Sequence, residues 1–525
     1  MSGEAATDVL VAGAGPTGLL LAAELCRRQV DCQVIDSLEA PRHWDRATVV
    51  HPRSLEVFEA MGIVDRFLAA GVRQRAVRLH SDGDVLGEMD LGTCGSAYGF
   101  NLGLSEEVTE SLLTDHLHAQ GGAVCRGRRL VGLEHRPDAV VATIEHDGER
   151  RELAAGWLVG CDGLHSCTRE LSGVAFEGHD IPEPWAVFDV TLDGWPDAFD
   201  VTFAYLDETP VILTALPGRR WRVYLRPSSP TTDLVHDAGR VIDRYRAGVT
   251  LVDVTNPTLF HCHTKLADRY RSGRVLLAGD AAHVCSPAQG HGMNSGLQDA
   301  FNLAWKLAVV CAGAAGPGLL DSYEAERRPV GLSITRSGDI AEQLERFADP
   351  ADRAARDAGL RSAFADPGSR YHEVVAEAEL DISYAGSPIV AGDGHEQLAA
   401  GERLPDTVPV QMRDGRARRL RQLIRGAGHT LFVLVGGSGP GDRVVGLVDE
   451  LGEIVAESPL LDAVVVLSAG AGLPASMGRL EPSIAAELSI DDVTVLAARP
   501  DGHIGLRFDG VRIEPLRQYL RLLRA

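Results

Sequence analysis

Three glycines and one aspartate near the start of the chain have the spacing of a phosphate-binding turn. Gly13, Gly15 and Gly18 follow the apolar run Asp8–Ala12, which predicts a strand, and an apolar run typical of a helix comes after them. The first glycine permits a tight turn, the second lets the backbone approach a pyrophosphate, and the third lets helix and strand pack closely. Asp36 ends the next predicted strand, where its carboxylate could bind ribose hydroxyls. The pattern predicts a dinucleotide site without identifying the dinucleotide.

A second candidate segment lies in the middle of the chain. Residues Arg274–His283 predict a strand whose end carries Gly279 and Asp280, and a glycine-rich loop follows at Pro287–Asn294. The next helix has apolar residues at helical spacing, so its N-terminus should point out of the loop, where it stabilises negative charge. Taken alone, this pattern is equally typical of an ordinary strand-to-helix connection. Its partnership with the first motif favours a ligand site.

Hydrophobic periodicity predicts the elements that must position these residues. Residues 7–36 form a complete βαβ unit, and short alternating runs between turn residues predict an antiparallel sheet from Val187 to Arg226. A helix-rich stretch follows from Asn294 to about Phe347. We expect a linker at Asp349–Ser387, which is rich in Ala, Asp, Gly and Pro.

A smaller α/β unit is predicted beyond the linker. It comprises a strand at 430–435, a helix or strand at 444–451, a strand at 463–467 and a hairpin at 493–507. The predicted fold class is therefore α/β, with a dinucleotide-binding unit, an antiparallel sheet and a separate C-terminal unit.

Composition limits the class of protein and its partners. The chain has 525 residues, of which 45% are hydrophobic and 24% charged, so a disordered chain or a disulfide scaffold is excluded. Its formal net charge of −23 disfavours nucleic acid and anionic lipid as partners. No apolar stretch reaches the roughly 18 to 20 residues that span a bilayer. The N-terminus lacks the basic region of a signal peptide.

Cysteine usage points to a reducing compartment. The nine cysteines include no CxxC pair, which fits the cytoplasm. His261, Cys262 and His263 alternate in direction if they lie on a strand, and no second cluster completes a metal site, so we expect no metal.

Together the motifs resemble those of the class A FAD-dependent monooxygenases, the aromatic hydroxylases of the para-hydroxybenzoate hydroxylase type. The matching segments are Gly13–Gly18 with Asp36, the Asp-Gly motif Cys161–Arg169, and Gly279–Asn294, and Asp321–Pro329 adds a helix segment often seen after them. The resemblance covers nearly the whole chain. Larger members that act on polyketide-like and phenolic substrates also carry a thioredoxin-like C-terminal domain, which residues from about 395 onward resemble.

The resemblance implies a Rossmann-like FAD-binding domain interleaved with an antiparallel-sheet substrate domain. The FAD-binding domain would comprise residues 1–180 and 260–390, the substrate-binding sheet 181–259, and the thioredoxin-like domain 395–525. Residues 436–442 stand where a working thioredoxin has its cysteine pair, and they contain no cysteine. That domain would therefore be structural or dimerising, which allows a homodimer.

The resemblance also implies a reaction. FAD would be the cofactor, NADPH or NADH the transient reductant, and O2 the co-substrate. A flavin C4a-hydroperoxide would hydroxylate a phenolic or polyketide-derived aromatic compound, as in bacterial antibiotic biosynthesis. Baeyer–Villiger oxidation, epoxidation and a non-catalytic flavoprotein of the same fold stay open. A flavin disulfide reductase is disfavoured, because residues 37–93 contain no cysteine pair.

By resemblance, the FAD contacts come from all three motifs and the segments between them. Asp36 would bind the adenosine ribose and Asp280 the ribityl chain, while Arg46 would lie near the pyrophosphate or flavin. Asp162 and Arg169 would support flavin and nicotinamide handling. The expected cofactor-binding residues are Gly13, Gly15, Pro16, Thr17, Gly18, Asp36, Arg46, Glu106, Leu130, Asp162, Arg169, Gly279, Asp280, Pro287, Gly290, Gly292, Met293 and Asn294.

Two positions, Glu106 and His291, depart from the family pattern, and no side chain is a universal catalyst. Glu106 replaces a usual Gln, which makes a neutral flavin contact acidic. His291 places an imidazole close to the expected flavin edge, where it could tune charge or fill space. Tyr224 and Arg226 share one face of a predicted strand and could contact a phenol, or could belong to a solvent-facing side. These last three residues are the candidates for a catalytic role.

Overall fold

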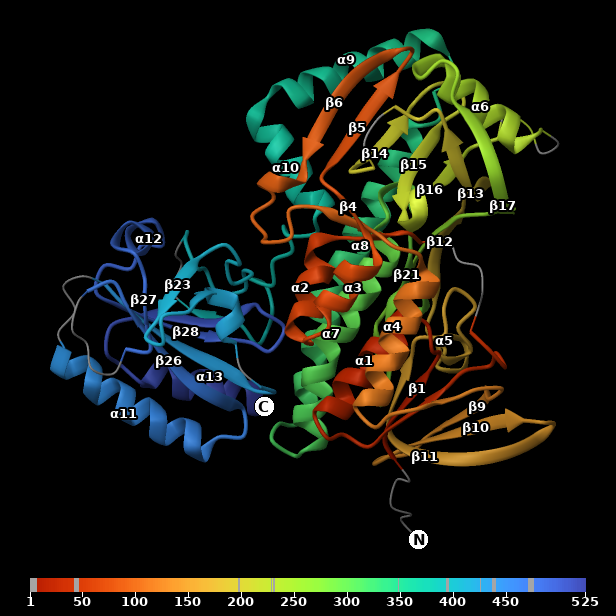
Figure 1. Cartoon of the computed structure of the whole chain (residues 1–525). Coiled ribbons are helices and arrows are strands. Elements are labelled where there is room, and N and C mark those ends of the chain that lie inside the picture. The colour runs from red at the N-terminus through yellow and green to blue at the C-terminus, as the bar shows by residue number, and fades with distance from the viewer. Residues whose placement is uncertain are drawn as a thin grey trace.

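The computed structural model describes residues 7–41, 47–196, 199–227, 229, 232–347, 349–392, 396–424, 426–436, 441–470 and 476–525. Figure 1 shows three main sheets arranged around the long helices α7 (His291–Cys311) and α8 (Asp321–Leu344). One sheet lies near the N-terminus, one lies at the opposite end of the helices, and the C-terminal sheet lies beside them. The predicted α/β class is confirmed.

The first sheet contains the predicted βαβ unit. β1 (Thr7–Ala12) pairs in parallel with β2 (Cys32–Ile35) and with β11 (Glu149–Gly160). Both faces of β1 are buried, as expected for a central parallel strand, and α1 (Pro16–Arg27) packs against α7. The strand order is β19-β20-β11-β1-β2-β8, and β10 joins β9 to β11. The remaining strands are β8 (Val124–Cys125), β9 (Arg129–His135), β10 (Val140–His146), β19 (Arg271–Ser272) and β20 (Val275–Leu277).

The second sheet has seven strands in the order β17-β13-β16-β15-β14-β5-β6. The predicted strands are confirmed as β15 (Val211–Leu216) and β16 (Arg220–Leu225), and their pairings are antiparallel. Two further strands, β5 and β6, come from residues before 181, and β5 pairs with β14 in parallel. The other bounds are β5 (Ala76–Ser81), β6 (Asp84–Asp90), β13 (Trp185–Asp193), β14 (Val201–Tyr205) and β17 (Thr250–Phe260). The helix α6 (Leu234–Tyr245) buries its apolar residues against this sheet.

The segment predicted as a linker is largely helical, so that prediction is wrong. It forms α9 (Pro350–Ala365) and α10 (Pro367–Glu377), which pack against β6. Asp349 and Asp366 precede these prolines, and each carboxylate accepts a hydrogen bond from a backbone N–H group in the first turn. The Asp-Pro pairs therefore begin helices here, because proline is favoured in a first turn.

The C-terminal sheet is built around β25 (His429–Val435). It pairs in parallel with β26 (Leu461–Ser468) and antiparallel with β28 (Val493–Ala498), which continues into β29 (Ile504–Asp509). The predicted strands and hairpin are confirmed, and residues 444–451 belong to the helix α11 (Gly441–Glu457). The likeness to thioredoxin stays a prediction, and residues 437–440 of the loop expected at the cysteine-pair position lie outside the described residues. The other elements are β22 (Ala391–Gly392), β23 (Pro409–Met412), β24 (Ala417–Arg419), β27 (Gly478–Arg479), α12 (Pro482–Glu487) and α13 (Glu514–Arg524).

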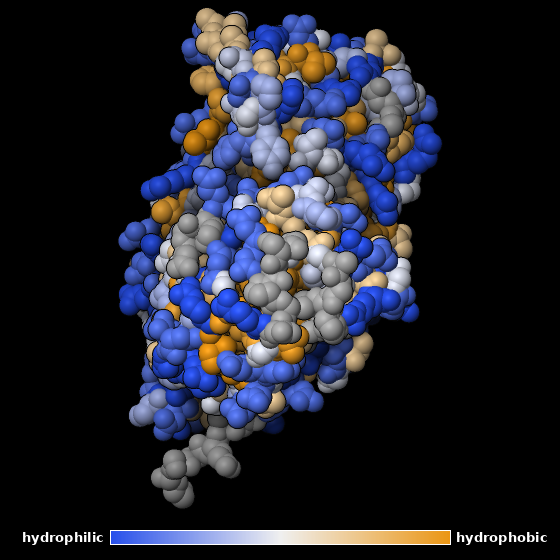
Figure 2. Space-filling model, turned by 90° about the vertical axis from the view of Figure 1, so that its left-hand side faces the viewer, coloured by the Kyte–Doolittle hydropathy of each residue, from blue (hydrophilic) through white to orange (hydrophobic). Residues whose placement is uncertain are grey.

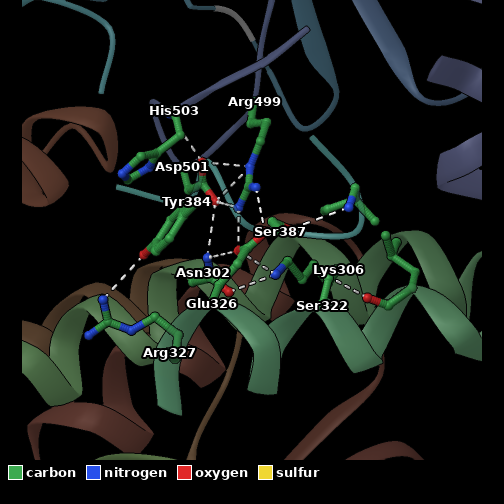
Figure 3. A network of polar contacts seen from close by, with 12 residues as sticks. Asn302, Lys306, Ser322, Glu326, Arg327, Tyr384, Ser387, Arg499, Asp501 and His503 are labelled. Carbon is green, nitrogen blue, oxygen red and sulfur yellow. Dashed lines mark hydrogen bonds and ion pairs between the residues drawn. The ribbon is translucent and has the colours of Figure 1, made fainter. Parts of the chain in front are cut away.

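A buried ionic network joins the C-terminal sheet to α7 and α8 (Figure 3). Arg499, between β28 and β29, binds both carboxylate oxygens of Glu326 on α8 at 2.7 Å. Lys306 on α7 binds the same carboxylate at 2.7 Å. Asp501 pairs with Arg499 and accepts a hydrogen bond from the Trp305 indole at 3.0 Å. Since these groups are almost fully buried, separating the two parts would leave charges without partners.

Two small three-stranded sheets and four helices complete the architecture around the site. The sheets have the orders β3-β7-β4 and β12-β18-β21. Their strands are β3 (Val49–Val50), β4 (Val72–Gln74), β7 (Asn101–Gly103), β12 (Phe176–Asp180), β18 (His263–Ala267) and β21 (His283–Val284). The helices are α2 (Pro52–Ala60), α3 (Val64–Ala70), α4 (Glu106–Ala119) and α5 (Cys167–Leu171).

The surface is mainly polar on the face that Figure 2 shows, with hydrophobic residues in small areas. Among the described residues, no helix has both the length and the apolar character to cross a bilayer. Within the same ranges, no three His, Cys, Asp or Glu side chains are grouped so that they could hold a metal ion.

Candidate functional site

A cavity of about 1670 Å³ lies between the first and second sheets. One side is formed by the β1–α1 turn and the N-terminus of α7, and the other by β5, β14, β15 and β16 with α8, α9 and α10. This volume exceeds the roughly 300 to 1,000 Å³ of a pocket for one small ligand. The cavity therefore has room for a dinucleotide and a second molecule.

Most of the predicted site residues meet in this cavity. Those that line it are Gly13, Gly15, Pro16, Thr17, Asp36, Glu106, Leu130, Asp162, Tyr224, Asp280, Pro287, Gly290, His291, Gly292 and Met293. The predicted residues that are not part of its lining are Gly18, Arg169, Arg226, Gly279 and Asn294. Arg46 lies outside the described residues.

Steric fit explains the three glycines of the β1–α1 turn. Gly13 has a φ of +102°, and a Cβ there would lie 2.2 Å from the carbonyl oxygen of Cys161. A Cβ at Gly18 would lie 2.0 Å from the carbonyl oxygen of Gly13, so α1 packs directly against the turn. At Gly15 the nearest atom is a Glu110 carboxylate oxygen at 3.8 Å, which leaves the backbone open to the cavity. No side chain caps α1, so its first N–H groups can receive an anion.

Asp36 forms a hydrogen bond with the β1–α1 turn and also lines the cavity. One carboxylate oxygen accepts a hydrogen bond from the Ala14 N–H group at 2.7 Å, and the other from Leu38 at 2.8 Å. The Arg126 guanidinium lies 3.7 Å away. These contacts hold the carboxylate at the cavity edge, and each oxygen keeps a second lone pair for a ligand.

The N-terminus of α7 faces the same cavity. Gly290 precedes the helix with a left-handed φ of +68°, and neither a side-chain cap nor an acidic residue occupies the first turn. His291, Gly292 and Met293 line the cavity, so the N–H groups of this turn, which lack intrahelical partners, lie at its wall. Asp280 is exposed toward the same space. This helix end favours negative charge on a ligand.

Three of the predicted residues hold the loops of the site. The Asp162 carboxylate accepts hydrogen bonds at 2.9 Å from the backbone N–H and the hydroxyl of Thr168 in α5. Arg169 donates to the carbonyl of Ala281 at 3.0 Å, beside Asp280. The Asn294 amide donates at 2.9 Å to a carbonyl of β3. These polar groups are engaged within the protein, so their predicted contacts with FAD stay predictions.

Two further predicted residues that line the cavity are Glu106 and Leu130. Glu106 begins α4, and its carboxylate accepts a hydrogen bond from the Ala47 N–H group at 3.4 Å. Leu130 is buried in β9 and also faces the cavity. Their predicted contacts with FAD stay predictions.

Tyr224 lines the cavity and Arg226 does not. The Tyr224 hydroxyl lines it, 2.9 Å from the Thr48 hydroxyl. Arg226 instead forms an ion pair with Glu342 on α8 and lies over the Trp185 ring at 4.8 Å. Tyr224 also packs against the cluster that contains Trp185, so the predicted common face of the two side chains stays a prediction.

His291 lies in the cavity wall next to His51, with 5.3 Å between ring centroids. Neither ring nitrogen of His291 has a hydrogen-bond partner among the described residues. Burial, with repulsion from His51, lowers the pKa of His291 to about 4. The ring is therefore neutral at pH 7 and can both donate and accept a hydrogen bond.

Comparisons with known proteins place the chain in a family. Residues 6–337 match the FAD binding domain family. The chain belongs to this family. It is 35% identical over 431 residues to 6-methylpretetramide 4-monooxygenase of Streptomyces rimosus. The alignment covers 79% of this chain and 77% of the relative.

Solved structures extend the similarity to the whole chain. An anhydrotetracycline hydroxylase from Streptomyces rimosus matches with a TM-score of 0.74 and 28% identity over 99% of both chains. An aklavinone-11 hydroxylase, solved with FAD and aklavinone, has the same fold, with a TM-score of 0.79 and 24% identity over 99% of both chains. The expected family is confirmed, and the protein is an FAD-dependent monooxygenase of the aromatic hydroxylase type.

The described residues of this flavoprotein fit FAD. The open backbone at Gly15 and the uncapped start of α1 form a cradle for a pyrophosphate. His291, whose ring nitrogens have no hydrogen-bond partner among the described residues, lines the same cavity as the uncapped start of α7. No loop of the described chain fills this space, since the cavity joins both helix ends.

Sequence reasoning missed the buried ion cluster beneath the Asp280 turn of the flavoprotein. Asp299 on α7 accepts hydrogen bonds from the Gly279 N–H group at 3.0 Å and lies 2.7 Å from the His283 ring. Arg327 on α8 pairs with it at 2.6 Å. The sequence signal that could have predicted this cluster is a charged residue on each of two otherwise apolar helix faces, Asp299 on α7 and Arg327 on α8.

Proposed function

We propose that the protein is an FAD-dependent hydroxylase of phenolic or polyketide-derived polycyclic aromatic compounds, with NADPH or NADH as reductant and O2 as co-substrate. The observation that carries this proposal is the double character of the cavity. One side has the phosphate-type turn and two helix N-termini, and the other is an apolar chamber between the second sheet and α8. The residues that define the apolar chamber are Val77, Leu79, Ala204, Leu206, Ile212 and Leu344.

The relatives support this class of substrate. They include enzymes named for 6-methylpretetramide, anhydrotetracycline and pentachlorophenol. An apolar chamber beside a flavin site suits ring systems of this kind, because burial of aromatic surface supplies most of the binding free energy.

The residues proposed to hold FAD follow its length. The β1–α1 turn and Asp36 would bind the pyrophosphate and adenosine ribose, Asp280 the ribityl chain, and the start of α7 the pyrimidine edge of the flavin. Once bound and reduced, FAD supplies the activation of O2, so that one oxygen atom enters the substrate and the other leaves as water.

The protein's own tasks are binding and exclusion of water. The apolar chamber holds the aromatic ring near the flavin site and keeps water away from the reaction. The Tyr224 hydroxyl lies at the boundary between the two sides and is placed to contact a substrate hydroxyl. The start of α7 favours negative charge beside it.

The proposal also covers the organisation of the chain. Residues 1–180 and 260–390 would hold FAD, and residues 181–259 with β5 and β6 would form the substrate wall. Residues 395–525 would be a thioredoxin-like domain without a redox role, which could support a homodimer. We propose the cytoplasm as the place of action.

The test uses the purified, FAD-loaded protein in air with NADPH and a panel of polycyclic phenols. We expect NADPH oxidation and oxygen uptake to accelerate with one class of phenol, and the product to be heavier by one oxygen. Product NMR separates a new phenol from a ring-expanded ester or an epoxide. A protein that cannot be loaded with FAD would contradict the proposal, as would one whose flavin is never reduced faster with any phenol.

A further inference from the structure

The apolar chamber contains a buried carboxyl group that the proposed function does not use. Glu345 follows the last turn of α8, has only 7% of its surface exposed and lines the cavity. Its Oε2 atom is buried and has no hydrogen-bond partner among the described residues. A buried polar atom without a partner is unfavourable, so a ligand is the natural source of the missing hydrogen bond.

The two arginines near Glu345 form their ion pairs with other carboxylates, and the Nε and Nη1 atoms of Arg226 have no hydrogen-bond partner among the described residues. Arg226, after β16, pairs with Glu342 on α8. Arg356 on α9 pairs with Asp357 at 2.7 Å and donates to the carbonyls of Leu344 and Leu206 at 2.9 and 2.7 Å. Among the described residues, neither arginine forms an ion pair with Glu345.

The surroundings favour the neutral form of Glu345. Burial raises the pKa of its carboxyl to about 8, and the nearby Glu342 carboxylate adds to this shift. The position at the C-terminus of α8 acts in the same direction, because that end of a helix disfavours negative charge. At pH 7 the group is therefore a carboxylic acid, which donates an O–H hydrogen bond.

We propose that Glu345 determines substrate specificity by donating a hydrogen bond to a carbonyl or hydroxyl oxygen of a neutral polycyclic substrate in the apolar chamber. This inference rests on the proposed function and defines its substrate class more narrowly. A purely hydrocarbon ring system would leave the acid without a partner. A ring system with one acceptor oxygen at that end would satisfy it without burying a second charge.

The first test compares two rigid probes of the same shape, 9-fluorenone with one acceptor oxygen and fluorene with none. Calorimetric titration of the FAD-loaded enzyme measures both affinities without turnover. We expect the wild type to prefer 9-fluorenone, and Glu345→Leu to reduce that preference by about three- to tenfold, the range for one hydrogen bond. Glu345→Gln keeps an N–H donor and should retain most of the preference for 9-fluorenone. Gln343→Leu, at an exposed neighbour, is the matched control.

The second test is the pH profile of the same titration. As the pH rises through about 8, the wild type should lose affinity for 9-fluorenone, because Glu345 becomes a carboxylate and repels the carbonyl oxygen. Glu345→Gln should show no such loss. The charged groups facing Glu345 are Glu342, Arg226 and Arg356, and fluorene in a parallel titration reports any change that they cause.

An unchanged preference in Glu345→Leu, or no binding of 9-fluorenone to the wild type, would overturn the inference. Its failure is distinguishable from failure of the proposed function. If the wild type hydroxylates a phenol and Glu345→Leu binds both probes with unchanged affinity, only the inference about Glu345 is contradicted. If the probes bind as expected but no substrate stimulates NADPH oxidation, only the proposed reaction is contradicted.

Discussion

Asp280 presents a carboxylate to the cavity from a turn that the buried Asp299 cluster holds in place. We predict that Asp280→Ala weakens FAD binding by about 1–3 kcal/mol, because a ribityl hydroxyl would lose its acceptor. The measurement is the flavin-to-protein absorbance ratio after gel filtration. Asp280→Asn keeps an acceptor oxygen and serves as the control. Full flavin occupancy in the alanine variant would count against the assignment.

His429 links the C-terminal sheet to α7 and makes stability depend on pH. Its buried ring packs edge-on against Trp305 and lies 3.0 Å from the Tyr519 hydroxyl. Burial lowers its pKa from 6.5 to about 4. In this window the unfolded chain takes up a proton that the folded chain does not, so His429 makes the protein less stable as the pH falls.

For His429→Gln we predict how the difference in unfolding free energy between the wild type and the variant changes with pH. As the pH falls from 6.5 to 4, the unfolding free energy of the wild type should decrease by up to about 1.4 kcal/mol per pH unit relative to that of the variant. Denaturant unfolding of both proteins at pH 7 and pH 5 measures this difference. A constant difference would show that His429 titrates normally in the folded protein.

Residue types alone could locate much of the candidate site, because its ligand-facing groups are glycines, carboxylates and helix starts in contiguous motifs. Gly13, Asp36 and Asp280 meet in one cavity as their motifs suggested. The ion pair of Arg226 could not be predicted, since its partner Glu342 lies on a helix that is distant in the sequence. Glu345 could not be found at all, because only the pairing of distant elements buries it.

Among the elements, the β1–α1 turn is the most sterically constrained part of the site. We predict that Gly13→Ala abolishes FAD retention, because a Cβ would lie 2.2 Å from a carbonyl oxygen that cannot move freely. Gly62→Ala is the matched control, since Gly62 also has a positive φ, +77°, but nothing lies within 4 Å of its Cβ position. Absorbance ratios of the two variants separate steric blockage from backbone strain. Equal flavin content would contradict the steric account.

Local patterns predicted elements well where a strand and helix are contiguous, as in residues 7–36. They failed where distant segments complete a sheet. β5 and β6 join the second sheet through a parallel pair with β14, which no local signal encodes. The content of Ala, Asp, Gly and Pro predicted a linker at Asp349–Ser387, but composition does not show that its Asp-Pro pairs begin the helices α9 and α10.

At the scale of the whole molecule, the Arg499 network should decide whether the C-terminal sheet stays attached. We predict that Arg499→Met destabilises the protein by about 3–5 kcal/mol, because Glu326 and Asp501 would lose a buried cation. Thermal unfolding and limited proteolysis between α10 and β25 measure the effect. Arg521→Met, which breaks an exposed pair with Glu514, should leave both readouts unchanged. Equal melting temperatures for the two variants would mean that the network contributes nothing.

The central claim is that this flavoprotein inserts one atom of molecular oxygen into an aromatic substrate. The most direct measurement is mass spectrometry of the product formed by the FAD-loaded enzyme with NADPH, a stimulating polycyclic phenol and ¹⁸O₂. The account predicts a product with one ¹⁸O atom, and an unlabelled product when the label is in water instead. A product without label from ¹⁸O₂, or NADPH oxidation that yields only hydrogen peroxide with every phenol tested, would contradict it.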